Sequence, residues 1–375
     1  AVVIDRLLFV GRYHVPRVAG GIVGDVSRYA GMLGPVGNYA LDRPLEAPSQ
    51  AERPSARAAA GYWSGPLARP VGNIARARLL ESLCGAYPSF LPIPGRRRGL
   101  WTCIANDWYD HGRILRRYVG MSADIQIHGK VQHGWQSGCG IDGERGYKPE
   151  AERIGFPVFV WSSRNLLAAR GEGMDRATTA IGAPFLYREH GPDPGPAAND
   201  LLCFPYHSIP EYPVAADWRA YGENVLRTAR EHGFASATIC LYCYDMERDA
   251  TRDVLRELGL EVRTLGQPHE LHFMDRCVAL IREHAAVTSD RICTAGLYAE
   301  ALGRPFFVSG TPLRSSPPDP DEGMGADRDW IAREMPEFLT FTGQGHRDVA
   351  LRELGAEYVQ PPEQLRQTLY GWCLP

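Results

Sequence analysis

The chain contains 375 residues with a mass of 41.5 kDa, and a typical size of about 150 residues per domain predicts two domains. A hydrophobic fraction of 44% with 23% charged residues is typical of a globular protein and excludes a fibrous or disordered chain. The 41 basic and 44 acidic residues give a formal net charge of −3, without the positive excess that nucleic-acid binding requires. No run reaches about 18 uncharged apolar residues, so no membrane span is predicted. The cysteine count is nine, an odd number, and we identify no secretory signal, so we expect a reducing, cytoplasmic location.

The first half of the chain, residues 1–190, predicts a decorated α/β domain that would lie on the acceptor side of a binding site. Its strand-like stretches are residues 6–15, 123–129, 157–163 and 178–186, and its helical candidates are residues 113–119 and 164–171. A segment dense in proline and glycine, residues 188–200, follows and predicts a flexible linker.

The second half has the clearest architecture. Between residues 201 and 310, short apolar strands alternate with helices of about ten or more residues in the order β-α-β-α-β-α-β-α-β. Parallel strands need such crossover connections, so residues 201–345 predict a doubly wound parallel sheet with helices on both faces. The tail, residues 346–375, predicts helix, strand and helix, with the last helix crossing back to the first domain. We expect two Rossmann-like domains facing each other across a cleft, with ligands at the carboxyl ends of the strands.

The first candidate site lies in residues 287–308. Thr288 and Ser289 end a predicted strand, and Thr294 and Gly296 open the next helix. A helix N-terminus made of small residues presents amide N–H groups and the positive end of the helix dipole, which suits a phosphate group. The alternative is a helix cap with tight packing of helix on sheet.

Two further loops are expected at the same edge. His207 and Ser208 follow the first strand of the second domain, near the expected change of strand direction, where they would face the same phosphate. A structural or surface histidine beside prolines is the alternative. Gly20 and Gly21 follow the first strand of the chain and would form either a phosphate or acceptor loop or a simple turn.

His133 is the candidate general base. It follows a predicted strand in a glycine-rich turn with Gly134 and Trp135, and an imidazole titrates near neutral pH. A structural histidine in a tight turn is the alternative explanation. No metal site and no cofactor are predicted from the sequence.

The residues 288–308, TSDRICTAGLYAEALGRPFFV, resemble the donor-nucleotide region of GT-B glycosyltransferases, and the HGWQSG and PYHS segments resemble the bacterial surface-polymer, glycerol-phosphate and sialic-acid-type branch. The resemblance implies that His133 is the base and that the donor phosphate is surrounded by His207, Ser208, Thr288, Ser289 and Thr294. Many retaining members have a glutamate that contacts the donor ribose where this chain has Tyr298, whereas Glu300 lies two residues later and is our candidate for nucleotide binding, with Gly296. The difference at Tyr298 favours inverting chemistry.

The sequence therefore predicts a metal-independent glycosyltransferase that moves a sugar from a nucleotide-sugar donor to a hydroxyl of a glycan, lipid-linked or secondary-metabolite acceptor. Three alternatives stay open: a nucleotide-sugar 2-epimerase, a polyol-phosphate transferase and a non-catalytic nucleotide-sugar-binding protein.

Overall fold

The computed structural model describes residues 90–92, 101–122, 125, 127, 129–138, 157–173, 178–209, 212–268, 272–318 and 324–371. The predicted strand at residues 6–15 and the loop of Gly20 and Gly21 lie outside these residues. The described strands are β1 (Phe90–Pro92), β2 (Trp101–Cys103), β3 (Lys130–Val131), β4 (Val158–Val160), β5 (Thr178–Ala180), β6 (Asp200–Cys203), β7 (Ser236–Leu241), β8 (Glu261–Thr264), β9 (Ala286–Ser289) and β10 (Phe306–Val308).

The helices of the same residues are mostly short. They are α6 (His111–Tyr118), α8 (Ser163–Gly171), α9 (Trp218–Glu231), α10 (Cys243–Met246), α11 (Asp249–Glu257), α12 (Phe273–Glu283), α13 (Thr294–Ala301), α14 (Arg328–Glu334), α15 (Arg347–Glu353) and α16 (Pro362–Tyr370), with 3-10 turns η5 (Ile104–Asp110), η6 (Pro184–Tyr187), η7 (Met324–Ala326), η8 (Pro336–Leu339) and η9 (Ala356–Tyr358).

Two parallel sheets organise the molecule, which confirms the α/β class. The large sheet has the strand order β10-β9-β6-β7-β8, and the small sheet has the order β3-β4-β5; every strand pair within both is parallel. In the large sheet the chain runs from β6 outward to β8 and then returns to the other side of β6 with β9. This order is that of a doubly wound nucleotide-binding sheet, and its direction changes between β6 and β9.

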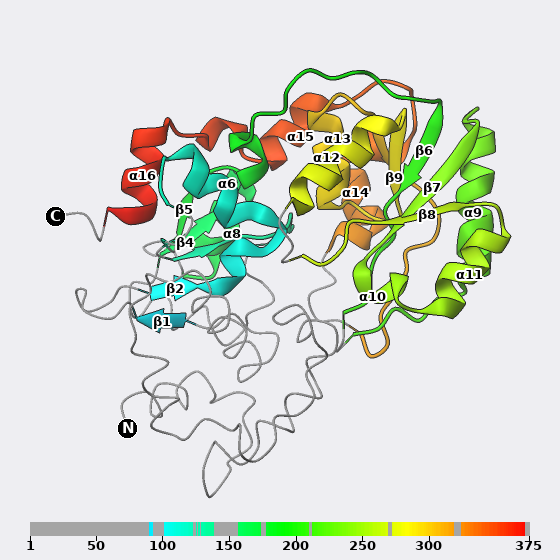
Figure 1. Ribbon diagram of the computed structural model, residues 1–375, viewed down its shortest axis with the longest axis horizontal. Coiled ribbons are helices and arrows are strands. Elements are labelled where there is room, and N and C mark those ends of the chain that lie inside the picture. The colour runs from blue at the N-terminus through cyan, green and yellow to red at the C-terminus, as the bar shows by residue number, and fades with distance from the viewer. Residues whose placement is uncertain are drawn as a thin grey trace, which may run out of the picture.

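The two faces of the large sheet carry different cores, because successive side chains of a strand point to opposite faces. Leu201 and Ile239 pack with α9 and α11, whereas Leu202 and Val287 pack with α12 and α13. The second core continues into the first half of the chain, where it includes Trp161, the residue that directly follows strand β4 of the small sheet. We call the small sheet with helices α6 and α8 the first unit. Helices α12 and α13 therefore lie between the large sheet and the first unit, as Figure 1 shows.

Most predicted elements of the described first half are present. The helices predicted at residues 113–119 and 164–171 correspond to α6 and α8, and the strands predicted at 157–163 and 178–186 contain β4 and β5. Most of the strand predicted at residues 123–129 lies outside the described residues, and the described strand β3 pairs with β4 from Lys130 onward.

The linker segment, residues 188–200, is held by arginines of the second half. Arg282 donates to the carbonyl oxygens of His190 and Gly191 at 2.6 and 3.2 Å. Arg304 forms a two-bond ion pair with Asp193, with both distances at 2.9 Å. The expectation of a flexible linker is therefore corrected, because its backbone carbonyls and its aspartate are tied to the helices behind the large sheet.

The C-terminal tail lies against the first unit. The backbone N–H of Ala183 donates to the carbonyl of Leu354 at 2.8 Å, and the hydroxyl of Tyr118 donates to the carbonyl of Gln360 at 3.1 Å. Leu365 of α16 is fully buried in the shared core, and Figure 1 shows α16 beside α6. The strand predicted in this tail is wrong, since the segment between α15 and α16 contains the 3-10 turn η9.

Gly296 packs helix α13 onto β10. A Cβ atom at this position would lie 2.5 Å from ring atoms of Phe306, a side chain that is itself buried. We expect Gly296→Ala to lower the free energy of unfolding by about 1–3 kcal/mol, because the ring has to leave its place in a packed core. Urea unfolding measures the change.

The matched control is Gly171→Ala at the end of α8, where an added Cβ meets nothing within 4 Å. Equal stability of the two alanine variants would contradict the packing role of Gly296.

Candidate functional site at the carboxyl ends of the strands

Loops from four strands of the large sheet meet at one edge, where the order of the strands reverses. The loop after β6 contains His207, the loop after β7 begins with Tyr242, and the loop after β9 leads into α13. A reversal of strand order leaves a crevice between the loops on either side of it, and ligands of doubly wound sheets bind there.

Asp290 joins these loops. Its carboxylate is fully buried and accepts the backbone N–H of Tyr206 at 2.8 Å and that of Leu313 at 3.0 Å. It also pairs with the guanidinium of Arg291 at 3.1 Å, and that guanidinium lies 3.7 Å from the centre of the Tyr206 ring, a cation–π contact. One side chain therefore fixes the relative positions of the loops after β6, β9 and β10.

We expect Asp290→Asn to lower the free energy of unfolding by roughly 2–3 kcal/mol. In asparagine an NH2 group stands where one of the two carboxylate oxygens accepts a hydrogen bond, so one of the two buried backbone N–H groups loses its acceptor. Denaturant titration gives the value. Asp217→Asn is the control, since Asp217 caps α9 through Ala220 N alone and asparagine caps a helix equally well. A loss in the control as large as that of Asp290→Asn would refute the role of Asp290.

The loop that carries His133 lies against the N-terminus of α13. It starts at the carboxyl end of β3, and the backbone N–H of Trp135 donates to Thr294 Oγ1 at 2.8 Å. Gly134 lies so close that a Cβ built on it would be 3.5 Å from the same oxygen. In the first turn of α13, the sulfur of Cys293 accepts the N–H of Gly296 at 3.4 Å. The structure thus brings the predicted base loop and the predicted phosphate helix into direct contact.

His133 is held between aromatic rings. Trp108 meets it edge-on with ring centres 5.6 Å apart, and Tyr109 stacks on it at 6.1 Å. Its Nδ1 is buried and has no hydrogen-bond partner among the described residues. Burial, and to a smaller degree the positive charge of Lys130, lowers the pKa of His133 to about 3. The imidazole is therefore neutral near pH 7 and retains a lone pair that can accept a proton.

A row of rings connects His133 to His207. The hydroxyl groups of Tyr109 and Tyr242 lie 3.5 Å apart, and Tyr242 stacks on His207 with ring centres 4.1 Å apart. The two histidines predicted on opposite sides of the binding site are thus bridged by one tyrosine from each side.

The turn that supplies Tyr109 has strained backbone. Tyr109 and Asp110 have φ values of 57° and 67°, in the left-handed region that residues other than glycine seldom adopt. The second half of the chain holds this turn, because Tyr109 N donates to Pro268 O at 2.7 Å and Met274 N donates to Asp110 Oδ2 at 3.2 Å. Such conformations persist where the surroundings enforce them, often at functional sites.

Four other predicted site residues form hydrogen bonds within the fold. Ser208 is buried, donates to Asp245 at 2.5 Å and accepts Val214 N at 2.8 Å. Thr288 is buried and bonds to Phe307 O at 2.9 Å and to the Ser309 hydroxyl at 2.8 Å. Each of the two hydroxyl groups therefore fixes the fold of its own loop, and its contact with a phosphate stays a prediction.

Ser289 and Glu300 also bond within the fold. Ser289 is buried, and its hydroxyl accepts Arg291 N at 3.4 Å within the turn that leads to α13. Glu300 is fully buried and accepts the backbone N–H groups of Phe306 and His346 at 2.6 and 2.5 Å. Glu300 therefore joins α13, β10 and the start of α15, where a ribose contact had been considered.

The buried carboxyl of Glu300 makes the stability of the chain depend on pH. Burial raises its pKa to about 7, although the two N–H groups that donate to it act in the opposite direction. Between the ordinary value of 4.5 and about 7, the folded chain holds a proton that the unfolded chain has released. The contribution of Glu300 to stability therefore decreases as pH rises through this window.

We expect wild type to lose roughly 3 kcal/mol more stability than Glu300→Gln between pH 5 and pH 8, because glutamine does not titrate. Urea unfolding of both proteins at several pH values measures this difference in stability. The histidines titrate in both proteins, so their contribution is the same and drops out when the two free energies of unfolding are subtracted. A constant gap between the two proteins across the range would show that Glu300 ionises normally.

Sequence reasoning missed Asp290, Tyr109, Tyr242 and Glu353. Asp290 directly follows a predicted strand end in TSD, and this position was a usable signal. The two tyrosines and the glutamate carried no such signal, since their partners lie more than 100 positions away in the chain.

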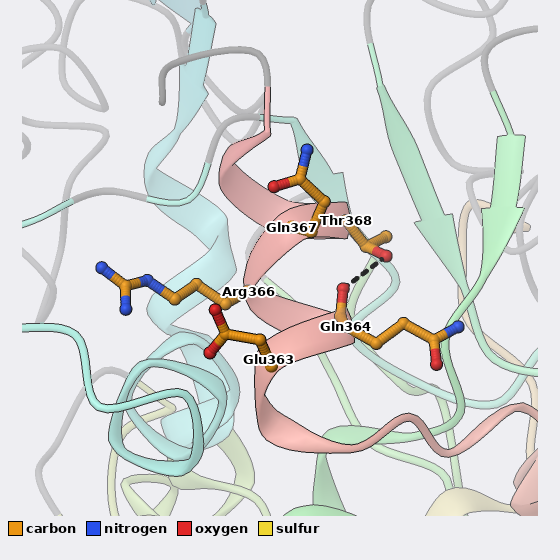
Figure 2. A pocket seen from close by; sticks show the side chains of 5 residues that line it. All are labelled: Glu363, Gln364, Arg366, Gln367 and Thr368. Atoms are coloured by element: carbon orange, nitrogen blue, oxygen red, sulfur yellow. Dashed lines mark hydrogen bonds between the residues drawn. The ribbon is translucent and has the colours of Figure 1, made fainter. Parts of the chain in front are cut away.

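Two hollows lie apart from these loops. The larger, of about 550 Å³, is lined by side chains of α16. Figure 2 shows them projecting from one helix: Glu363, Gln364, Arg366, Gln367 and Thr368. The smaller, of about 380 Å³, lies between α8 and α15 and includes Arg164 and Glu353. Neither includes His133, His207 or Thr294, so the loops and not a cavity define the candidate site.

The described residues contain no group of three or more histidine, cysteine, aspartate or glutamate side chains placed to hold a metal ion. Within the same part of the chain, no helix has the length and apolar character needed to cross a membrane.

Comparison with known proteins gives weak structural likenesses. No protein-family model matches the sequence, and no curated protein matches it. Among solved structures, the chain is similar to TarM of S. aureus in complex with Fondaparinux, alpha-GlcNAc-glycerol and UDP, with 13% identity, a TM-score of 0.32 and coverage of 61% of this chain and 43% of that one. It is also similar to the UDP-GlcNAc 2-epimerase of Neisseria meningitidis bound to UDP-GlcNAc, with 11% identity, a TM-score of 0.28 and coverage of 59% and 70%.

A second TarM structure gives 12% identity, a TM-score of 0.33 and coverage of 68% of this chain and 51% of that one. The chain thus spans about half the length of the TarM chains that it matches. The fold is that of an α/β protein in which the loops at the carboxyl ends of a doubly wound parallel sheet contact the loop that follows β3 of a second parallel sheet.

Proposed function

We propose that this chain is a GT-B-type glycosyltransferase that moves a sugar from a nucleotide-sugar donor to a hydroxyl group of a glycan, lipid-linked or secondary-metabolite acceptor, with inversion and without a metal ion. One observation carries the proposal. The loop that carries His133 follows strand β3 of the small sheet. It contacts Thr294, the first residue of α13, near the place where the strand order of the large sheet reverses, with Trp135 N and Thr294 Oγ1 2.8 Å apart.

The donor side is the large sheet. The N-terminus of α13 has backbone N–H groups without partners inside the helix, and its dipole favours a negative charge. These groups would stabilise the charge that develops on the leaving diphosphate, a role that needs no metal ion. His207 borders the same crevice from the loop after β6, so its ring is our candidate for a second contact to the phosphate.

The acceptor side is the loop of His133. The neutral imidazole would take the proton of the acceptor hydroxyl while that oxygen forms a bond to the sugar and the nucleoside diphosphate leaves with the bonding electron pair. A pKa of about 3 makes a weak base. The negative charge of a bound diphosphate would raise this pKa, because it favours the protonated ring. Base strength would thus increase when the donor is present.

The open alternative of a 2-epimerase has less support. That reaction needs carboxylates free to act as acid and base. Of the buried carboxylates beside these loops, Asp290 binds two backbone N–H groups, Asp245 binds Ser208, and Glu353 binds Trp135 and Arg164. A binding protein without catalysis and a polyol-phosphate transferase are outcomes that the following experiment distinguishes.

We expect His133→Ala to lower turnover by about 10²–10⁴-fold, the usual contribution of a general base, and to leave nucleotide binding unchanged. Thermal shift with UDP, GDP, CDP, CMP and dTDP identifies the nucleotide, because a ligand that binds the folded chain raises its apparent stability. Release of that nucleotide from its sugar conjugates, with and without acceptors, measures turnover.

His232→Ala on the exposed end of α9 is the control for replacement of a histidine. If His133→Ala abolishes binding together with turnover, or keeps both, His133 is not the base. Nucleotide binding by wild type without turnover supports the binding-protein alternative, and transfer of a polyol phosphate supports the other.

A further inference from the structure

The side chain of Trp135 is anchored by the C-terminal tail. Its indole Nε1–H donates to Glu353 Oε2 at 3.0 Å, across 218 positions of sequence. Glu353 is the last residue of α15, and its side chain is only 3% exposed. A hydrogen bond to a buried carboxylate is stronger than one between neutral groups, so this contact fixes the indole ring.

The carboxylate of Glu353 is itself held in place. Arg164 of α8 donates to it through Nε at 2.9 Å and through Nη2 at 3.0 Å, the two-bond geometry that fixes both partners. The guanidinium of Arg164 also lies 5.2 Å from the ring centre of Trp330 on α14. Glu353 thus has its orientation set by the first unit and by the second half together.

Trp135 has two N–H groups, and each bonds to a different helix. The backbone N–H bonds to Thr294 on α13, and the indole N–H bonds to Glu353 on α15. The ring packs against Trp330, with ring centres 6.0 Å apart. His133 is two residues earlier in the same short loop, so these contacts restrict where its imidazole can lie.

We propose that Glu353 is a positioning residue for the base loop: through the indole of Trp135 it sets the distance between His133 and the N-terminus of α13. This inference rests on the proposed function, because it assigns Glu353 a task in that reaction. Displacement of a reacting group by about 1 Å can cost up to about 100-fold in rate. The contact therefore acts on kcat and leaves donor binding largely unchanged.

The experiment compares four single variants and one double variant of the full chain. Glu353→Ala removes the acceptor and the charge, Glu353→Gln keeps one acceptor oxygen, and Trp135→Phe keeps a ring but removes the indole N–H. Glu334→Gln is the matched control, because Glu334 pairs with the same Arg164 at 3.4 Å through a half-exposed side chain, whereas the indole N–H of Trp135 donates to Glu353. The probes are UDP-GlcNAc, UDP-glucose, GDP-mannose and dTDP-glucose, with nucleotide release as the measure.

We expect kcat to fall about tenfold or more in Glu353→Ala and in Trp135→Phe, with the KM for the donor within about twofold of wild type. Glu353→Gln should recover much of the rate, and Glu334→Gln should match wild type. The Glu353→Ala, Trp135→Phe double variant should be no slower than the slower single variant, because both changes break one contact. Additive losses, or equal kcat in Glu353→Ala and Glu334→Gln, would overturn the positioning role.

The indole N–H signals of ¹⁵N-tryptophan-labelled protein keep the test independent of folding defects and of the proposed reaction. The signal lost in Trp135→Phe identifies Trp135, and we expect it to shift in Glu353→Gln but not in Glu334→Gln. An unshifted signal in Glu353→Gln refutes the contact. Wild type that shows this shift pattern but neither binds nor turns over any probe refutes the proposed function, and with it the catalytic task of Glu353, while the contact itself stands.

Discussion

A hydrogen bond between the backbone of Trp135 and the hydroxyl of Thr294 joins the two sheets at the candidate site. Each partner sits at the carboxyl end of a parallel strand, where a loop is free to vary without disturbing the sheet below. The bond places the N-terminus of α13 beside the turn that contains His133. The proposed chemistry depends on this adjacency, since a base and a phosphate site act together only when both reach the same substrate.

The adjacency is maintained by a core that both units share. Helices α12 and α13 pack on one face of the large sheet and also on residues of the first unit. Tyr298 shows the connection in one side chain: its ring stacks on Phe185 at 4.2 Å, and its hydroxyl lies 3.4 Å from His111 Nε2. The tail adds α16 to the same core. A shared apolar core favours one relative arrangement of its parts, because separating them would expose buried surface.

Polar groups at the site fall into two kinds. Asp290, Asp245 and Glu353 are buried carboxylates that receive several donors each, so they organise loops and are poor candidates for proton transfer. His133 differs, because its Nδ1 is buried without a partner among the described residues and its pKa is lowered by burial. An unpaired buried nitrogen costs stability, and such costs are often found where function requires them. His111 shares both features, since its Nδ1 also has no partner among the described residues and burial lowers its pKa to about 3. His133 is the proposed base because it lies in the loop whose Trp135 contacts Thr294 at the start of α13.

Local pattern was sufficient to predict the α/β class, the strand and helix order of residues 201–310, and the helices α6 and α8, because hydrophobic periodicity depends on near neighbours in sequence. It also placed His133, Thr294 and His207 after the ends of strands, because polar residues that directly follow apolar strands lie at one edge of a parallel sheet; their roles in binding and catalysis stay predictions. It did not show that Ser208, Thr288, Ser289 and Glu300 bond to the fold itself, nor that Glu353 contacts Trp135. Ser208 bonds to Asp245 across 37 positions and Trp135 to Glu353 across 218, and spacing along the chain does not encode which distant segments pack together. Ser289 and Glu300 have partners nearer in sequence, but only the folded turn and the start of β10 bring these donors to them.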